Sequence, residues 1–249
     1  MGCAAVSWIE GETVRPLRLS IIIPALNEAA VIDATLVRLQ PLRERGAEVI
    51  LADGGSDDGT VERAAGQVDR VVAAPPGRAR QMNAGAAAAG GEWLWFLHAD
   101  TVVPAEADAM IPAALVAAGR EWGRCRVRLS GRHPLFRIIE RLMNLRSCLT
   151  GIATGDQGLV VQRAAFEVVG GYPELPLMED IELSRALRRR GRPVCLATTL
   201  TTSSRRWEDN GILRTVVLMW GLRLRWFLGA DTAGPGRRRR RRGTSAGAA

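Results

Sequence analysis

Four short hydrophobic runs in the first hundred residues alternate with segments of helical character. The runs cover residues 19–24, 49–52, 69–73 and 92–98. After the first run, apolar residues recur at helical spacing, at Val31, Ile32, Leu36 and Leu39. Short helices are expected after the second run and from Pro104, and an alanine-rich helix over 78–90. Apolar runs joined by short helical connections are typical of parallel strands buried on both faces. The pattern therefore predicts an α/β fold with a mostly parallel central sheet flanked by helices.

The second half of the chain follows a less regular order. Strands are expected at 124–130, 159–161 and 193–197, and helices at 134–150 and 180–190. We expect both halves to form a single domain over residues 18–210.

Residues 211–229 are predicted to form an amphipathic helix. Its apolar face, at about 100° per residue, consists of Leu213, Val217, Trp220, Leu224 and Phe227. Arginines interrupt the segment, and its uncharged run at 215–222 is far shorter than the roughly 20 residues that a spanning helix needs. The face could lie in a membrane interface or pack on the domain. Residues 230–249 are predicted to be disordered, because Gly, Ala, Pro and Arg dominate them.

The net charge of +8 is concentrated in one place. Arg237 to Arg242 is a run of six arginines, and removing these six charges from +8 leaves +2 for the rest of the chain. A nearly neutral domain lacks the electrostatic footprint of a nucleic-acid-binding protein, so no specific nucleic acid is expected. The arginine run could instead meet anionic lipid, so residues 211–242 are a candidate membrane-surface contact.

Residue types limit the chemistry further. The chain has no lysine, which excludes Schiff-base chemistry and a phosphate-loop lysine. The four cysteines form no C-x-x-C pair, and with two histidines they predict no zinc site. We expect scattered, reduced, mostly buried thiols. The N-terminal residues lack the pattern of a signal peptide, so a cytoplasmic protein is expected.

Polar residues follow three of the predicted strands. Asn27 and Glu28 follow the first strand, Asp53 ends the second, and His98 and Asp100 end the fourth. Ligands bind at the carboxyl ends of strands in open parallel sheets, so these side chains predict a ligand site. Alternatively, Asp53 and Asp100 could simply cap the helices behind them.

Five motifs in the same order resemble those of the family 2 glycosyltransferases. They are Ile21 to Glu28 (IIIPALNE), Leu51 to Thr60 (LADGGSDDGT), Arg78 to Ala86 (RARQMNAGA), Gly155 to Gly158 (GDQG) and Met178 to Asp180 (MED). The resemblance implies the A-type glycosyltransferase fold, a single nucleotide-binding α/β domain. Its nucleotide-binding half would span 18–103 and its acceptor half 104–210.

The resemblance implies transfer of a sugar from a nucleoside diphosphate to an acceptor hydroxyl. The family places a D-x-D metal motif where this chain has His98-Ala99-Asp100. Asp100 matches the metal-binding position, and His98 is expected to contact ribose or phosphate. Carboxylate and phosphate oxygens suit Mg²⁺ or Mn²⁺, and a nearby imidazole favours Mn²⁺. His98 could instead be a strand-end residue bonded to backbone.

The family also implies a nucleoside site. Pro24, Ala25, Asn27 and Glu28 would lie against the nucleoside. Asp53 would accept a hydrogen bond from the base, for example from N3–H of uracil, so a UDP-sugar is favoured. Arg80 would pair with the diphosphate, or be an ordinary surface arginine.

In the acceptor half, the family uses a carboxylate at a helix start as general base, and inversion at the anomeric carbon follows. Asp180 matches this place, with Glu179 and Asp156 as alternatives, although Asp180 could also serve only to cap its helix. Ser203 to Trp207 resembles a basic–aromatic element over the diphosphate and acceptor, so Arg205, Arg206 and Trp207 are candidates. This segment could also be a surface loop.

Two alternatives remain open. A sugar nucleotidyltransferase would have a similar sheet, but it normally carries a glycine-rich loop after the first strand, where this chain has no glycine. A catalytically inactive relative would fit the departure at His98. Relatives often use lipid-linked or membrane-bound acceptors, which favours a location at the inner face of the cell membrane.

Overall fold

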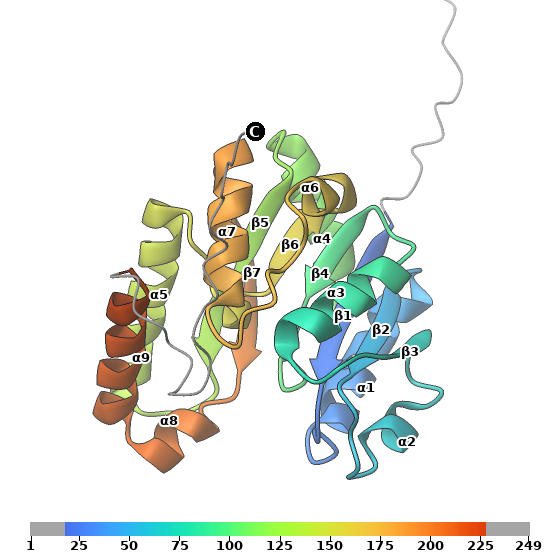
Figure 1. The fold of residues 1–249 in the computed structure, drawn as a ribbon, viewed down its shortest axis with the longest axis horizontal. Helices are drawn as coiled ribbons and strands as arrows, with labels where there is room; N and C mark the ends of the chain where they lie inside the picture. Colours follow the sequence, from blue (N-terminus) through green and yellow to red (C-terminus); the bar gives the residue numbers. More distant parts are fainter. Residues whose placement is uncertain (1–17, 228–249) are drawn as a thin grey trace, which may run out of the picture.

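The computed structural model describes residues 18–227, and the predicted disorder over 230–249 lies outside this range. A seven-stranded sheet forms its centre, in the order β3-β2-β1-β4-β6-β5-β7 (Figure 1). The strands are β1 (Leu19–Ala25), β2 (Glu48–Asp53), β3 (Arg70–Ala73), β4 (Trp93–Phe96), β5 (Trp122–Leu129), β6 (Leu159–Gln162) and β7 (Val194–Thr202). Only β6 runs against its neighbours, so the predicted mostly parallel α/β fold is confirmed.

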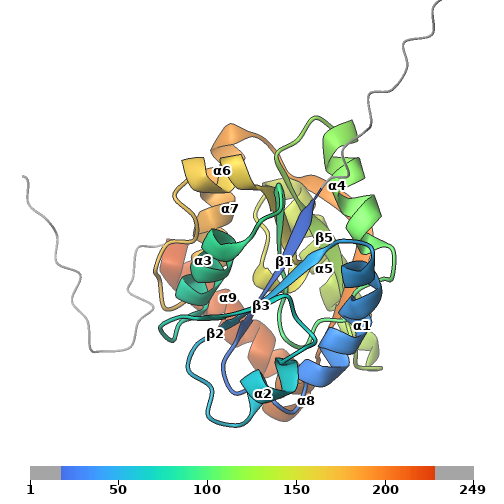
Figure 2. The same ribbon diagram turned by 90° about the vertical axis from the view of Figure 1, so that its right-hand side faces the viewer.

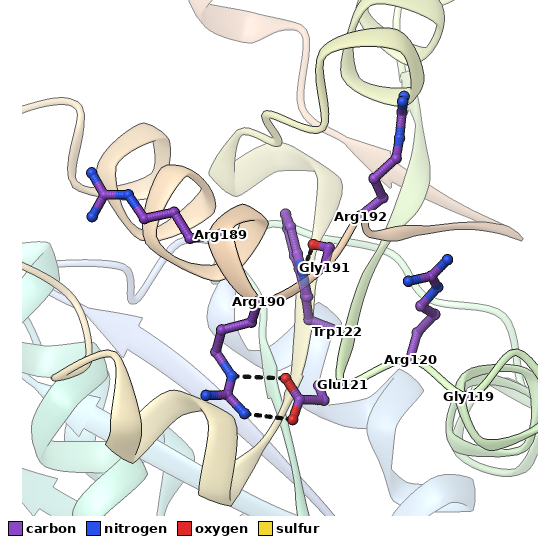
Figure 3. A pocket seen from close by; sticks show the side chains of 8 residues that line it. All are labelled: Gly119, Arg120, Glu121, Trp122, Arg189, Arg190, Gly191 and Arg192. Carbon is purple, nitrogen blue, oxygen red and sulfur yellow. Dashed lines mark hydrogen bonds and ion pairs between the residues drawn. The ribbon is translucent and has the colours of Figure 1, made fainter.

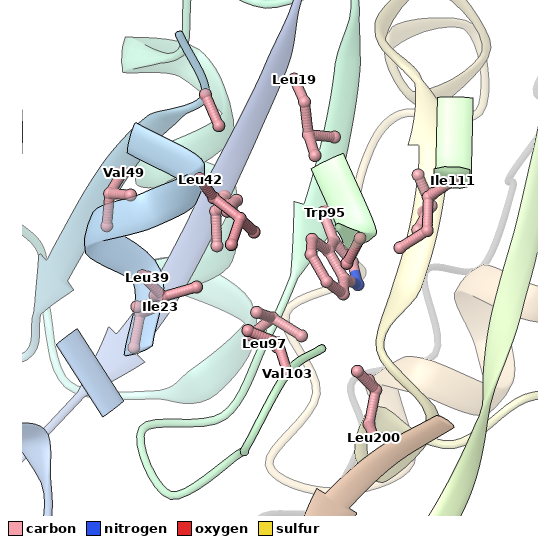
Figure 4. Packing of buried hydrophobic residues seen from close by; sticks show 14 of the residues in the cluster. Leu19, Ile23, Leu39, Leu42, Val49, Trp95, Leu97, Val103, Ile111 and Leu200 are labelled. Atoms are coloured by element: carbon pink, nitrogen blue, oxygen red, sulfur yellow. The ribbon is translucent and has the colours of Figure 1, made fainter. Parts of the chain in front are cut away.

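Alternating residues of β1 supply the two faces of the sheet. Ile21 and Ile23 pack with the inner face of α1 (Ile32–Glu44), while Ile22 packs under α3 (Arg78–Ala88). All three isoleucines are fully buried, as expected for a continuous apolar strand. Figure 4 shows Ile23 and Leu39 side by side in the first of these layers, with Trp95 beyond. The sheet is thus covered on both faces (Figure 2).

Two shorter helices belong to the first part of the chain and to the connection with the second. α2 spans Thr60–Ala64, and α4 spans Ala107–Ala117 rather than starting at Pro104. Pro104 instead precedes the helix by a turn, and its carbonyl accepts a hydrogen bond from Ala107 N.

The second half of the chain adds further helices. They are α5 (Pro134–Thr150), α6 (Arg163–Val168), α7 (Glu179–Arg190), α8 (Arg205–Asn210) and α9 (Ile212–Phe227), with a 3₁₀ turn at Gly155–Gln157. The hydrophobic pattern predicted α5, α7 and α9 but not the six-residue α6. The segment Ser203 to Trp207, for which a surface loop was the alternative, enters α8 at Arg205.

The prediction of reduced, scattered thiols is wrong for two of the four cysteines. Cys148 and Cys195 form a disulfide, with their Cα atoms 6.0 Å apart. The end of α5 lies beside the start of β7, and the sequence separation of 47 between the two cysteines gave no sign of this proximity. Cys125 is a free, buried thiol, as predicted, and Cys3 lies outside the described residues.

No helix within residues 18–227 is both long enough and apolar enough to cross a bilayer. α9 packs on the domain through Leu222 and Trp226, which contact a cluster formed by Ile152, Met178 and Ile181. Trp226 Nε1 also donates to Glu182 Oε1 at 3.0 Å. The predicted apolar face behaves differently, since Leu213, Val217 and Trp220 are exposed. The side chains of Leu224 and Phe227 lie outside those described.

Candidate nucleotide and acceptor site

Two loops at the carboxyl ends of β1 and β2 are held together by side chains. Asn27 has a positive φ of 57°; its Oδ1 accepts from Asp57 N at 3.0 Å, and its backbone N–H donates to Ser56 Oγ at 2.9 Å. Glu28 N donates to Thr60 Oγ1 at 2.9 Å. The residues predicted to meet the nucleoside therefore lie on one fixed edge, next to the turn that Asp53 begins.

Asp53 is buried at the end of β2 and organises this turn. Its carboxylate accepts from Gly55 N at 2.9 Å, Ser56 N at 3.1 Å and Ser56 Oγ at 2.5 Å. Behind it, Gln81 donates to the carbonyl oxygens of Ala25 and Ala52 and fixes α3 against both strands. A carboxylate has about four acceptor positions, so Asp53 keeps capacity for a ligand N–H.

Glu28 lies among charges from three other segments. Burial raises the pKa of its carboxyl group, and the negative charge of Asp100 raises it further. The guanidinium groups of Arg205 and Arg78 oppose this rise. Four segments therefore come together around Glu28: the end of β1, the segment after β4, the start of α3 and the start of α8.

His98 lies deeper in the same site. Its Nδ1 is 3.9 Å from Asp156 Oδ1, while its buried Nε2 has no hydrogen-bond partner among the described residues. Burial and then the charge of Arg78 lower the pKa of the imidazole, against the opposing charges of Asp156, Asp100 and Asp180. The lowered pKa favours the neutral imidazole, and Nε2 has no partner within the described residues.

Asp180 and Glu179 begin α7 beside this histidine. Met178, in the left-handed region at φ 68°, turns the chain into the helix. Asp180 Oδ2 accepts from Gly155 N at 2.8 Å, and Oδ1 accepts from Ile181 N at 2.8 Å. Asp180 therefore satisfies one N–H of its own helix and also joins α7 to the 3₁₀ turn. Burial and the neighbouring Asp180 raise the pKa of Glu179.

Arg78, rather than the predicted Arg80, reaches this acidic group. Arg78 Nη1 lies 3.6 Å from Glu179 Oε1, whereas Arg80 pairs with the exposed Glu174 at 3.0 Å. Residues two apart on a helix point about 200° away from each other, which explains the difference. The site role predicted for Arg80 stays a prediction.

A pocket elsewhere on the surface is separate from this site. It lies at the amino end of β5, the opposite edge of the sheet (Figure 3). Arg190 donates to both carboxylate oxygens of Glu121, and Trp122 Nε1 donates to Gly191 O. Glu121 and Arg190 are therefore paired with each other, and none of the predicted site residues lines the pocket.

The sequence matches the profile described as Glycosyl transferase family 2 over residues 20–149, a little more than half of the chain. The chain belongs to this family. Comparison with curated proteins found no match.

Solved structures share the fold of this family 2 chain. S. aureus TarS is 19% identical, with a TM-score of 0.60 over 75% of this chain and 60% of that one. Glucosyl-3-phosphoglycerate synthase from Mycobacterium tuberculosis, in complex with Mn²⁺, UDP-Glc and phosphoglyceric acid, is 20% identical, with a TM-score of 0.62 over 87% and 82%. The mannosyltransferase PcManGT from Pyrobaculum calidifontis, with GDP-Man and Mn²⁺, is 20% identical, with a TM-score of 0.58 over 76% and 57%. The chain spans about three fifths of the length of TarS.

Residues 18–227 of the family 2 chain contain no group of three or more His, Cys, Asp or Glu side chains arranged to hold a metal ion. Asp100 is nevertheless close enough to Glu28 to raise the pKa of that carboxyl. Mg²⁺ and Mn²⁺ sites in nucleotide enzymes commonly use one or two carboxylates and complete their shell with phosphate oxygens and water. Asp100 and its acidic neighbours fit that kind of site, and they do not fit a closed protein cage.

The family 2 motifs did not point to three further residues near Asp180. Tyr172 packs edge-on against Phe96, and burial, Asp180 and Glu179 raise the pKa of its phenol. The charge of Asp180 raises the pKa values of Arg146 of α5 and Arg223 of α9, against the lowering effect of burial. The only sequence signal for Arg223 was a charged residue within an apolar helix. The side chain of Arg206 lies outside those described, while Trp207 is half-buried.

Proposed function

We propose that this protein is an inverting glycosyltransferase that uses a nucleoside diphosphate sugar, with UDP favoured, and an acceptor hydroxyl. The observation that carries the proposal is the position of His98 among the carboxylates of Asp100, Asp156 and Asp180, which come from three separate segments. Family 2 membership supports sugar transfer. The structural neighbours with UDP-Glc and GDP-Man support a nucleotide-sugar donor.

The donor would lie along the edge formed by β1, β2 and β4. Asp53 would accept the base N–H, with Pro24, Ala25, Asn27 and Glu28 against the nucleoside. Arg78 and Arg205 would stand near the diphosphate, where arginine pairs well with phosphate oxygens. Asp100 would hold the divalent metal together with those oxygens. A bound metal would offset the charge that develops on the leaving diphosphate.

In the transfer step, the protein accepts one proton from the acceptor hydroxyl. The acceptor oxygen forms a bond to the anomeric carbon as the bond from that carbon to the diphosphate oxygen breaks. The acceptor hydroxyl proton passes to a carboxylate oxygen of Asp180, and the nucleoside diphosphate leaves with the electron pair. Attack opposite the leaving group inverts the anomeric configuration. Glu179 and Asp156 are the alternative bases, and Glu179 is held by Arg78.

Calorimetry with UDP and Mn²⁺ tests the donor side. We expect metal-dependent UDP binding in the wild type, its loss in Asp100→Asn and its retention in Asp180→Asn. Asp33→Asn, which removes an exposed carboxylate paired with Arg63, serves as the control. GDP and CDP are titrated alongside, so a different nucleotide preference is visible. Absence of binding to all three nucleotides would contradict the proposal and favour an inactive relative.

We also propose that the acceptor is lipid-linked or membrane-bound and that the protein works at the inner face of the cell membrane. Support comes from the exposed apolar residues of α9 and from the run Arg237 to Arg242, which lies outside the described residues. Such a surface followed by basic residues suits an anionic interface.

A further inference from the structure

Two partly buried arginines, Arg146 and Arg223, lie within reach of the charge of Asp180 and lack partners among the described residues. Nε and Nη2 of Arg146 and Nε of Arg223 are inaccessible to solvent and have no hydrogen-bond partner among the described residues. Neither guanidinium takes part in any of the ion pairs within residues 18–227. Buried charged groups are costly unless they are paired, so this arrangement requires an explanation.

Two other arginines that are fully or partly buried have several partners each. Arg124 donates to Cys125 O, to Asn144 and to Cys148 Sγ, although its Nε has no partner among the described residues. Arg163 donates to the carbonyl oxygens of Ala86, Ala89 and Gly91. Arg124 and Arg163 therefore keep most of their donors occupied, whereas the guanidinium groups of Arg146 and Arg223 have no hydrogen-bond or ion-pair partner among residues 18–227.

The two unpaired arginines are neighbours. Burial and then the charge of Arg223 lower the pKa of Arg146 to about 10. Burial also lowers the pKa of Arg223, while Asp180 and Asp156 oppose that shift. Two like charges held together away from water favour an anion between or beside them.

Their position places them on the acceptor side of the site. The charges that act on Glu28, at the nucleotide edge, are those of Asp100, Arg205, Arg78 and Asp58, and neither Arg146 nor Arg223 is among them. The charges that act on the arginine pair are instead those of the acceptor half.

α9 is held in the position that directs Arg223 toward the site. Leu222 and Trp226, on either side of Arg223 in sequence, contact the cluster at the start of α7. The bond from Trp226 Nε1 to Glu182 Oε1 fixes the same turn. In Figure 1, α9 lies at the same end of the molecule as α5, which carries Arg146.

We propose that Arg146 and Arg223 bind a phosphate ester group of the acceptor. This inference rests on the proposed function, since it places the acceptor next to Asp180. Two guanidinium groups offer several N–H donors that match phosphate oxygens in bidentate pairs. A phosphate monoester carries up to two negative charges and can offset both arginines, whereas a carboxylate carries one.

Titration with inorganic phosphate, in the presence of UDP and Mn²⁺, tests the pair directly. The variants are Arg146→Gln and Arg223→Gln. Their controls are Arg141→Gln on α5 and Arg225→Gln on α9, which remove the same charge from exposed positions. We expect at least tenfold weaker phosphate binding in each test variant and unchanged binding in each control. Equal phosphate binding in all four variants would overturn the inference, as would acetate binding as tightly as phosphate to the wild type.

Thermal unfolding and nucleotide binding distinguish loss of the phosphate subsite from misfolding and from loss of the nucleotide site. Each test variant loses an unpaired buried charge, so it should melt at or above the wild-type temperature without phosphate. Phosphate should raise the melting temperature of the wild type and not that of the test variants. UDP–Mn²⁺ titration of the same proteins reports on the proposed function separately. A wild type that does not bind UDP contradicts that function. A wild type that binds UDP, with equal phosphate binding in test and control variants, contradicts the phosphate subsite alone.

A last arm separates the sources of the phosphate ester. Glycerol 3-phosphate represents a soluble acceptor, and vesicles containing phosphatidic acid represent a lipid headgroup. Dependence of glycerol 3-phosphate binding on both arginines would identify a soluble phosphorylated acceptor. The same dependence seen only with the vesicles would identify a lipid headgroup. Dependence in neither arm would overturn the inference.

Discussion

At the scale of single residues, the candidate site depends on a close approach between Gly155 and His98. A Cβ added at Gly155 would lie 2.5 Å from His98 Nε2. The same glycine donates its N–H to Asp180, so one residue fixes the positions of both the His98 imidazole and the proposed base. Any residue with a side chain at position 155 would displace the His98 imidazole.

Gly155→Ala should therefore disturb the site more than the fold. We expect a loss of about 1–3 kcal/mol in the free energy of unfolding from overpacking, and UDP–Mn²⁺ binding weakened at least severalfold. Gly90→Ala is the control, because its Cβ would meet only ordinary contacts of 3.6 Å or more. Denaturant unfolding and calorimetry measure the two effects. Equal behaviour of both variants would show that His98 has room to move.

Glu179 offers a test of electrostatics at one buried carboxyl. Its folded pKa is raised, by burial first and then by Asp180. The ionised form is therefore destabilising, and this penalty appears as the pH rises above the unfolded value of about 4.3 and is complete above the raised folded pKa. Glu179→Gln removes the penalty, so the variant should melt above the wild type at pH 7, with the gap closing toward pH 4.

Thermal melts across pH 4 to 8 measure this gap. Glu174→Gln, which changes an exposed carboxyl paired with Arg80, should differ from the wild type by no more than about 0.5 kcal/mol. A Glu179→Gln variant that melts below the wild type at pH 7 would mean that the ion pair with Arg78 outweighs burial and repulsion.

At the scale of elements, the orientation of α3 determines which of its two arginines points toward the site. Arg78 and Arg80 belong to one sequence motif, but Arg78 contacts Glu179 and Arg80 contacts Glu174. We expect Arg78→Gln to weaken UDP–Mn²⁺ binding by about 10-fold or more, as for the loss of a charged hydrogen-bond partner. Arg80→Gln is the matched control and should bind within about twofold of the wild type. The reverse order would support the original prediction that Arg80 pairs with the diphosphate.

The elements themselves were largely predictable because their causes are local. The run of three isoleucines in β1 is buried on both faces, and apolar spacing alone located α1, α5 and α7. The reversal of β6 and the Cys148–Cys195 disulfide depend on which distant segments meet, and no local pattern encodes that. Arg146 and Arg223 escaped notice for the same reason, since 77 positions separate them in sequence and only the packing of α9 brings them together.

At the scale of the whole molecule, two neighbouring helices expose apolar residues at one end. α5 exposes Ile138, Leu142, Leu145 and Leu149, and α9 exposes Leu213, Val217, Leu218 and Trp220. Both helices lie at the end of the molecule away from α1 and α2 (Figure 1). Exposed apolar residues therefore come from two helices and not only from the single face that the sequence predicted, and exposed apolar groups of this kind commonly mark interaction sites.

The full-length protein should bind vesicles that contain anionic lipid through this surface and the arginine run together. Val217→Ser combined with Trp220→Ser should lower co-sedimentation severalfold, because both side chains are more than 60% exposed and would enter the interface. Val37→Ser is the control, because this valine of α1 is also more than 60% exposed and lies at the other end of the molecule. Deletion of residues 237–242 should weaken binding at low salt by up to about 1 kcal/mol per arginine, with the difference fading at high salt. If the double variant and Val37→Ser bind equally well, the apolar surface does not meet the membrane.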